Sequence, residues 1–353
     1  MSKIILHNRP CLDRQEIKTV SNVLKSGWLA QGPQVEKLER AMVSYLGSKN
    51  AQALAFSSGT AALYVALVAL GIKKGDQVII PTYVCSALLN AIYLTGAQPV
   101  LVDIDEEDLN ISVPEARKKI TSKTKAIIVT HTFGYPGRLT ELLKLGVPII
   151  EDCAQALGAK YRGRQVGNFG RLAIFSFYAT KMITSGYGGL VYSRDKELMA
   201  KVRDFRQFDG QSKYRPRFNF SMSDLQASIA LVQLRKLPTF LAKRQALAAK
   251  YYKVWRTFET WPGRQSNAVK PNYYRFLLRT AQAKEVKTKL ARRQIEAAVP
   301  IRQSELLHRT LGQAKKGFPV AEKVSVESLS LPIFPALRTS EIKRLLSVFK
   351  TIV

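Results

Sequence analysis

The chain contains few of the residues that mark secreted and metal-binding proteins. Its 353 residues include only three cysteines, at positions 11, 85 and 153, and none of them forms a CxxC pair. This spacing excludes a disulfide framework and fits a reducing cytoplasm. The three histidines, at positions 7, 131 and 308, are too widely spaced to indicate a metal site. We therefore expect a cytoplasmic protein without a metal centre.

Targeting segments and long apolar runs are also missing. The first seven residues have no extended apolar core and no cleavage pattern, which argues against a signal peptide. The most apolar helical stretch, over residues 61–70, is far shorter than a bilayer-spanning helix. We therefore expect no membrane-spanning segment.

Acidic residues are scarce, with 26 Asp and Glu against 55 Lys and Arg, so the formal net charge is +29. Residues 1–200 carry 24 basic and 16 acidic side chains, whereas residues 201–353 carry 31 and 10. The electrostatic field of such a positive surplus attracts polyanions, including nucleic acid. However, the basic residues are dispersed through helical patterns, and no nucleic-acid-binding motif accompanies them. We favour a solvated basic surface, followed by attraction of an acidic small substrate, over nucleic-acid binding.

Short apolar strands alternate with helical segments through the first half of the chain. This pattern predicts an α/β domain with a mostly parallel sheet. The length suggests about two domains. After Asp204 the pattern changes to a long loop over 205–220 and two helices separated by Pro238. We therefore predict a large α/β domain over residues 1–238 and a small C-terminal α+β domain over residues 239–353. In the small domain we expect a strand over residues 273–280 and a helix over residues 284–298. The predicted strands of the large domain span residues 77–80, 99–102, 126–129, 147–150, 172–177 and 189–192.

Polar residues stand at the carboxyl ends of these strands, where open α/β sheets bind ligands. They are Asp103, His131, Glu151 with Asp152, and Ser176. Asp152 follows a fully apolar strand, so its carboxylate needs a partner or a cleft. A simple helix cap would also explain it.

Two further stretches contain candidate functional groups. Ser58, Gly59 and Thr60 precede a helix that is apolar all round, and its free amides and nearby hydroxyls suit a phosphate, although a capped core helix fits equally well. Lys181 follows the predicted strand 172–177 in a segment without other charges. Burial favours the neutral amine, which is a nucleophile toward carbonyls. The alternative is an ordinary surface lysine.

With these elements placed, the sequence resembles the DegT–DnrJ–StrS family of pyridoxal-phosphate-dependent sugar aminotransferases. The likeness covers nearly the whole chain, and its specificity comes from the number and order of matching segments. They are Gly27-Trp28 with Gly32-Pro33, 58–63, 81–90, 102–105, Phe133-Gly134, 151–156, 176–181, 186–189, 219–233 and 318–322 through Leu331-Pro332.

The resemblance implies the aspartate-aminotransferase fold (fold type I), with a mixed seven-stranded sheet in a large α/β domain and a small C-terminal domain. It also implies that Lys181 binds pyridoxal phosphate as an imine and later transfers a proton. Asp152 would pair with the pyridine nitrogen. The other implied cofactor-binding residues are Ser58, Gly59, Thr60 and Ser176 at the phosphate, Gln155 and Cys85 beside the ring, and Asn219, which would reach the phosphate of a neighbouring subunit in a homodimer with shared active sites.

Four positions depart from the family pattern. Cys85 replaces a ring-stacking aromatic residue, so its thiol or nearby Tyr83 would cover that face. Tyr187 replaces a frequent acidic residue, and Ser221 a frequent arginine. The segment 302–307 lacks the usual tyrosine and proline. These changes concern the substrate more than the cofactor.

The resemblance implies transfer of an amino group from an amino acid, with glutamate as the expected donor. The acceptor would be a keto sugar on a nucleoside diphosphate, with a 3- or 4-keto-deoxysugar expected, in polysaccharide or lipopolysaccharide biosynthesis. Three alternatives stay open: a pyridoxamine-phosphate-dependent sugar dehydratase, in which histidine would replace Lys181; a cofactor-binding regulator or nucleic-acid-associated protein; and amination of a non-sugar ketone such as an inosose.

Overall fold

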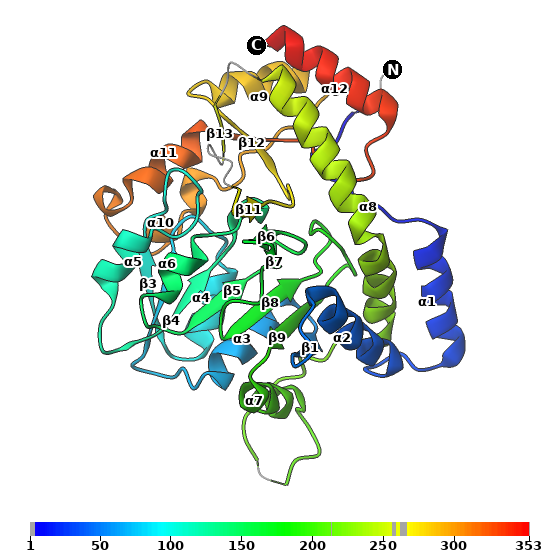
Figure 1. Ribbon diagram of the computed structural model, residues 1–353, viewed down its shortest axis with the longest axis vertical. Helices are drawn as coiled ribbons and strands as arrows, with labels where there is room; N and C mark the ends of the chain where they lie inside the picture. The colour runs from blue at the N-terminus through cyan, green and yellow to red at the C-terminus, as the bar shows by residue number, and fades with distance from the viewer. Residues whose placement is uncertain (1–3, 213, 256–258, 262–266, 353) are drawn as a thin grey trace.

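A seven-stranded mixed sheet forms the centre of the computed structural model, which describes residues 4–212, 214–255, 259–261 and 267–352. The strand order is β1-β9-β8-β5-β4-β2-β3 (Figure 1). Strand β9 is antiparallel to both neighbours, and the other neighbouring pairs are parallel. The strand bounds are β1 Gln52–Phe56, β2 Gln77–Pro81, β3 Gln98–Val102, β4 Thr124–Val129, β5 Ile149–Asp152, β8 Leu172–Ser176 and β9 Gly189–Ser193. The six strands predicted from the sequence for the large domain are confirmed, as is the mixed seven-stranded sheet that the resemblance implies.

Both faces of this sheet are buried, which explains why its strands are continuous apolar runs. Alternate residues of β2 show this directly: Val78 and Ile80 belong to one core cluster and Ile79 to another. The first cluster contains residues of α3 Gly59–Ala69, α4 Ala87–Leu94, α7 Lys196–Arg206 and α11 Pro319–Glu327. The second contains residues of α2 Pro33–Leu46, α5 Val113–Lys119, α6 Leu139–Leu143 and α8 Asp224–Val254. The sheet is therefore the middle layer between two groups of helices.

A third core cluster holds the C-terminal part of the chain together, at the top of Figure 1. It joins the second half of α8 to a three-stranded sheet, β10-β12-β13, and to the helices α9 and α12. Their bounds are β10 Thr260–Trp261, β12 Phe276–Arg279, β13 Ser328–Leu331, α9 Ala283–Arg292 and α12 Thr339–Ile352. The remaining elements are α1 Arg14–Ser26, α10 Leu307–Thr310, the sheet of β6 Lys160–Tyr161, β7 Arg164–Gln165 and β11 Val269–Lys270, and 3₁₀ turns at Thr132–Gly134, Gln303–Glu305 and Lys315–Gly317.

The predicted helix break at Pro238 is wrong, because α8 continues through that proline from residue 224 to residue 254. Proline inside a helix costs about 3 kcal/mol. Here α8 packs against α1 and α2 at one end and α12 at the other, so tertiary burial outweighs that cost (Figure 1). The predicted domain boundary at 238 falls inside this helix and stays a prediction.

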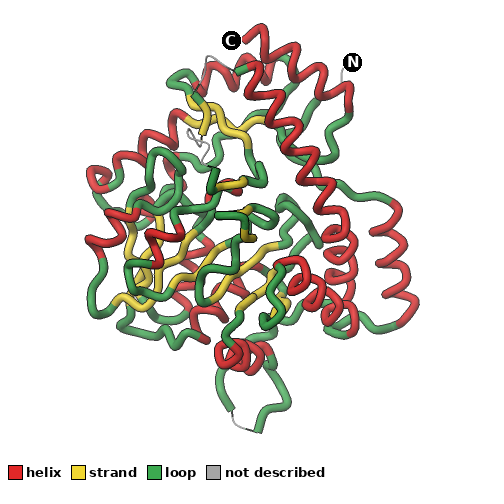
Figure 2. The backbone as a smooth tube through the Cα atoms, in the orientation of Figure 1, coloured by secondary structure: helices red, strands yellow, loops and turns green. Residues whose placement is uncertain are grey.

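Two predicted C-terminal elements are shorter in the structure. The strand expected from residue 273 begins at Phe276, because Tyr273 has φ 54°, outside the range of a strand. The helix expected over 284–298 ends at Arg292, and Gln294 has φ 57° just beyond it. By contrast, the predicted long loop is confirmed: the described residues between α7 and α8 project from the body as a loop (Figure 2).

Glu322 ties α11 to the end of β2. Its carboxylate accepts hydrogen bonds from Arg309, from His308 Nε2 at 2.9 Å and from Gln303 at 2.8 Å. His308 in turn bonds Thr82 at 2.8 Å and stacks on Phe318. Mainly the hydrogen bond from Arg309 lowers the pKa of Glu322 from 4.5 to about 2.

This pKa shift predicts a contribution to acid stability. Because the folded pKa of Glu322 lies below the unfolded one, its stabilisation is complete above about pH 4.5 and is lost as the pH falls toward 2. We expect Glu322→Gln to lower the free energy of unfolding at pH 7 and to flatten its decline between pH 4.5 and 2, as measured by urea unfolding. Glu36→Gln, at an exposed ion pair with Arg40, is the control and should change little. Equal pH slopes for Glu322→Gln and the native protein would contradict this assignment.

Candidate active site

A pocket of about 230 Å³ opens where the N-terminus of α3 meets the ends of β5 and β8. Seven of the nine predicted site residues line it: Ser58, Gly59, Thr60, Cys85, Asp152, Ser176 and Lys181. The rest of the lining is mainly apolar or aromatic: Leu63, Ala87, Leu88, Ala154, Ile174, Tyr178, Tyr187 and Gly188. Segments far apart in the sequence therefore meet in one cavity.

The N-terminus of α3 presents unpaired backbone donors to this pocket. The Ser58 hydroxyl accepts from the Ala61 amide at 3.1 Å, and the Ser58 carbonyl accepts from the Ala62 amide at 3.0 Å. Within the described chain, the amides of Gly59 and Thr60 have no acceptor. Free amides at a helix N-terminus attract anions, so this end of the pocket suits a phosphate group.

Two glycines let the chain approach this helix end closely. A Cβ at Gly189 would lie 2.2 Å from the carbonyl oxygen of Ser58, and one at Gly59 would lie 2.9 Å from the Ser176 Cβ. Both distances are too short for any larger side chain. The absence of side chains therefore brings the Ser176 hydroxyl next to the amides of α3.

Asp152 is a buried carboxylate at the end of β5, with 8% of its surface exposed. One of its oxygens accepts from the Ala154 amide at 2.9 Å, and its other oxygen has no hydrogen-bond partner in the described chain. Burial raises the pKa of Asp152, although the Ala154 amide and the charge of Lys181 oppose the rise. A cationic N–H group in the pocket would provide the missing partner.

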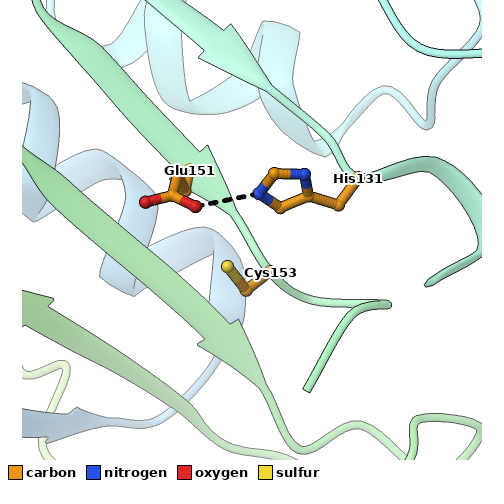
Figure 3. A group of neighbouring side chains, drawn as sticks. All are labelled: His131, Glu151 and Cys153. Carbon is orange, nitrogen blue, oxygen red and sulfur yellow. Dashed lines mark hydrogen bonds and ion pairs between the residues drawn. The ribbon is translucent and has the colours of Figure 1, made fainter. Parts of the chain in front are cut away.

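The neighbouring Glu151 points to the other side of the strand and has a structural role (Figure 3). Its oxygens accept from the amides of Gly167, Phe169 and Gly170, each at 2.7 Å, and from His131 Nε2 at 3.0 Å. Burial alone would raise the pKa of Glu151, but these hydrogen bonds and the His131 ring lower it overall.

Cys153 lies beside this pair, and the potential metal-binding atoms of the three residues are within 4.8 Å of one another (Figure 3). However, His131 Nδ1 accepts from the Gly137 amide at 3.1 Å, so its Nε2 carries the proton given to Glu151. Burial raises the pKa of the Cys153 thiol well above its usual value. The group is a hydrogen-bonded cluster that fixes the end of β5.

The expectation that all polar strand ends share one site is therefore wrong. Asp152 and Ser176 line the pocket, whereas His131 and Glu151 bond each other. Asp103 instead caps α11, accepting from the Val320 amide at 2.8 Å and the Ala321 amide at 3.0 Å. The orientation of each strand-end side chain, which the sequence does not reveal, decides between these roles.

Lys181 lies in the turn after β8 and is half-buried. Its amide donates to the Tyr178 carbonyl at 2.9 Å, and its amino group lies 5.5 Å from the centre of the Tyr274 ring. No hydrogen-bond or ion-pair partner of that amino group occurs among the described residues. The amine is therefore available to a group in the pocket.

Cys85 and Tyr83, the two residues expected at one face of the cofactor ring, differ in their exposure. Cys85 lines the pocket and is reached by solvent through its mouth, while the surrounding protein and the Asp152 charge raise the pKa of its thiol. Tyr83 is fully buried, with its hydroxyl 3.3 Å from Ser328, and does not line the pocket. Of the two residues expected to cover that face, only Cys85 lines the pocket, and its role there stays a prediction.

The remaining two predicted residues lie outside the pocket lining. The Gln155 side chain accepts from the Phe133 amide at 2.8 Å. Asn219 is exposed on the loop before α8, where its side chain accepts from the Ser221 amide at 3.2 Å. Their roles at the cofactor stay predictions.

The sequence also left some lining residues without a role. Tyr178 and Tyr187 are exposed at the pocket mouth and contact each other edge to face, with ring centres 5.4 Å apart.

Tyr274 comes from the C-terminal part of the chain, nearly a hundred residues after Lys181. No local pattern in the sequence could pair Tyr274 with Lys181, because their proximity depends on how the segment before β12 packs against the large sheet.

Comparisons with known proteins identify the family of this chain. The model of the DegT/DnrJ/EryC1/StrS aminotransferase family matches residues 10–350. An uncharacterized Methanocaldococcus jannaschii protein, MJ1066, is 35% identical, and the match covers 98% of this chain and 96% of that protein.

Several solved structures are also similar to this chain. DesV of S. venezuelae has 30% identity, a TM-score of 0.89 and 98% coverage of both chains. PseC of Helicobacter pylori, an aminotransferase involved in pseudoaminic acid biosynthesis, has 26% identity, a TM-score of 0.89 and 99% coverage of both chains. The pyridoxamine-phosphate form of a Streptococcus pneumoniae protein described as a sugar aminotransferase, Spr1654, has 26% identity and a TM-score of 0.91, with 99% of this chain and 97% of that chain covered.

The fold and pocket thus define a sugar aminotransferase of fold type I. The chain belongs to the DegT/DnrJ/EryC1/StrS aminotransferase family, and its cofactor is pyridoxal phosphate. The pocket fits that cofactor, because it offers unpaired amides for the phosphate, a buried carboxylate and an available amine. None of the helices in the described part of the chain is both long enough and apolar enough to cross a bilayer.

Proposed function

We propose that this enzyme transfers the amino group of glutamate to a keto sugar carried on a nucleoside diphosphate, a 3- or 4-keto-deoxysugar. The observation that carries this proposal is the meeting of Lys181, Asp152 and the α3 N-terminus in one pocket. An amine, a carboxylate and an anion site in one cavity are the groups that a phosphorylated aldehyde cofactor requires.

Each residue has a proposed role that follows from its position. Lys181 would bind the cofactor covalently and, when not so bound, would accept and return a proton at its amino group. Asp152 would keep a proton on the ring nitrogen, and pyridoxal phosphate would supply an electron sink for the bonds that change. The α3 amides and the hydroxyls of Ser58, Thr60 and Ser176 would hold the phosphate. The Cys85 side chain would face the ring.

The proposed acceptor rests on charge and on the family. The basic surplus after residue 200 suits a substrate that carries a diphosphate, although one ligand needs far fewer charges. The structurally similar PseC is an aminotransferase involved in the biosynthesis of pseudoaminic acid. We therefore propose a role in polysaccharide or lipopolysaccharide biosynthesis. A cytoplasmic location stays a prediction.

The alternatives are less well supported. Lys181 argues against the dehydratase, whose relatives resemble this family but have histidine at that position. A regulator or nucleic-acid-associated protein would not require the amine and carboxylate of this pocket. An inosose acceptor stays an alternative because the segment 302–307 departs from the family pattern.

A half-reaction screen tests the proposal. The protein is loaded with pyridoxamine phosphate, mixed with single keto sugar nucleotides, and followed by absorbance for return of the aldehyde form. We expect a nucleotide-linked 3- or 4-keto-deoxysugar to restore it fastest. If only an inosose restores it, the acceptor assignment is wrong; if tight, sequence-selective DNA binding occurs without cofactor and no ketone reacts, the enzymatic role is wrong.

We also propose a homodimer with shared active sites. Asn219 lies on the projecting loop between α7 and α8, outside the pocket of its own chain. Exposed aromatic side chains accompany it, including Phe208, Tyr214 and Phe218. A second copy would cover these rings and receive Asn219.

Mixed dimers test this sharing. Lys181→Ala and Asn219→Ala are each expected to be nearly inactive, and their co-refolded equimolar mixture should regain about a quarter of the native activity, since half the dimers have one complete site. The measurement is the amino-transfer rate of the mixture with glutamate and the acceptor found above. A mixture no more active than its components would show that Asn219 serves its own subunit or none.

A further inference from the structure

Tyr274 connects the C-terminal part of the chain to the turn that carries Lys181. Its ring centre is 5.5 Å from the Lys181 amino group, and its hydroxyl is 3.4 Å from the Thr180 hydroxyl. The ring is 92% buried, since only 8% of the residue is exposed. Tyr274 therefore contacts Lys181 and the residue before it.

The position of Tyr274 is fixed from several sides. Asn272 accepts from the Tyr274 amide at 2.9 Å and donates to the carbonyls of Gln155 and Leu157 at 2.9 and 3.0 Å. Buried Arg244 donates to the Tyr274 carbonyl at 3.2 Å. These bonds link Tyr274 to the segment that follows β5 and its Asp152.

Two arginines also lie near Tyr274, so the attraction to the Lys181 amine comes from the face of the ring and not from the surrounding charges. The guanidinium of Arg275 lies 5.4 Å from the ring centre, and that of Arg244 lies behind its carbonyl. Burial alone would raise the pKa of Tyr274, but Lys181 and Arg275 lower it overall. On the Lys181 side, the other titratable groups are Asp152 and Cys85, while His7 contacts Arg275 at 3.2 Å.

We propose that Tyr274 is a positioning residue that holds the free Lys181 amine over its ring, aimed into the pocket. The inference rests on the proposed covalent role of Lys181. A lysine has four flexible bonds, and the cation–π contact restricts them when the amine is not bound to cofactor. The ring, rather than the hydroxyl, carries this role, because the 3.4 Å contact to Thr180 is long for a hydrogen bond.

The experiment measures covalent attachment of pyridoxal phosphate to the full-length apoenzyme, trapped with borohydride and quantified by intact mass over time. Without the ring the Lys181 side chain is free to adopt other rotamers, and this loss of orientation predicts an attachment rate about 3- to 30-fold lower in Tyr274→Leu. Tyr274→Phe keeps the ring and should stay within about threefold of the native rate. Tyr252→Leu, a control at a half-buried aromatic residue that packs on Tyr273 and Phe276, should attach cofactor at the native rate.

The outcomes separate this inference from the function on which it rests. If Lys181→Ala is labelled like the native protein, the proposed covalent role itself fails. If Lys181→Ala is unlabelled but Tyr274→Leu and Tyr274→Phe are slowed equally, the ring has no positioning role and the inference is overturned. It is also overturned if Tyr274→Leu attaches cofactor at the native rate, or if Tyr252→Leu is slowed as much. The expected result is that Tyr274→Leu attaches cofactor slowly, whereas Tyr274→Phe and Tyr252→Leu attach it at close to the native rate.

Discussion

Lys181→Ala should reduce amino transfer by about 10⁴-fold or more, because the variant loses both the group that binds the cofactor and the group that moves the proton. The cofactor would bind only through its phosphate and ring contacts. The visible band of the covalently bound aldehyde and the borohydride-trapped mass should both disappear. Steady-state rates with glutamate and the matched acceptor, together with the absorption spectrum, measure this effect.

The matched control is Lys160→Ala. Lys160 is also half-buried but lies in β6, outside the pocket. The Lys160→Ala variant should keep the native absorption spectrum and a rate within about twofold of native, as expected for a substitution outside the site and the core. A Lys181→Ala protein that retains the covalent band would end the assignment of this lysine.

Asp152→Asn should reduce the rate by ~100-fold or more while leaving the fold intact. The amide can still accept from the Ala154 amide, but it carries no charge to hold a proton on the ring nitrogen. Removing one partner of a buried charged pair costs about 3–5 kcal/mol, which corresponds to this loss of rate. The measurements are kcat, the dissociation constant of pyridoxal phosphate and the melting temperature.

Glu151→Gln provides the contrast, because it changes the neighbouring carboxylate on the opposite side of β5. Glu151 accepts three backbone amides and His131, so its amide variant should lose roughly 3 kcal/mol of unfolding free energy. Its rate should fall less than that of Asp152→Asn under conditions where both are folded. A catalytic loss in Glu151→Gln larger than in Asp152→Asn would reverse these two assignments.

Much of this fold could be predicted from local patterns. The seven strands of the central sheet are apolar runs bounded by polar residues, and burial on both faces requires such runs. The short motifs around Ser58, Asp152 and Lys181 lie directly after strands β1, β5 and β8. Because strand ends that carry ligands gather at one edge of the sheet, these residues meet in the pocket as expected.

Other features could not be predicted because they depend on contacts between distant segments. Asp103, His131 and Asp152 all follow apolar strands, yet one caps α11, one bonds Glu151 and one lines the pocket. Pro238 should end a helix on local grounds, but packing against α1, α2 and α12 keeps α8 continuous.

The sequence alone determined the family, the layer architecture and the residues that bring an amine, a carboxylate and an anion site to this protein, because these are encoded in short apolar and polar patterns. Only the tertiary structure decided which polar side chains face the pocket and that Tyr274 lies against Lys181. The reason is physical: direction and proximity between distant residues come from the packing of strands and helices, and that packing is a property of the whole chain rather than of any local segment.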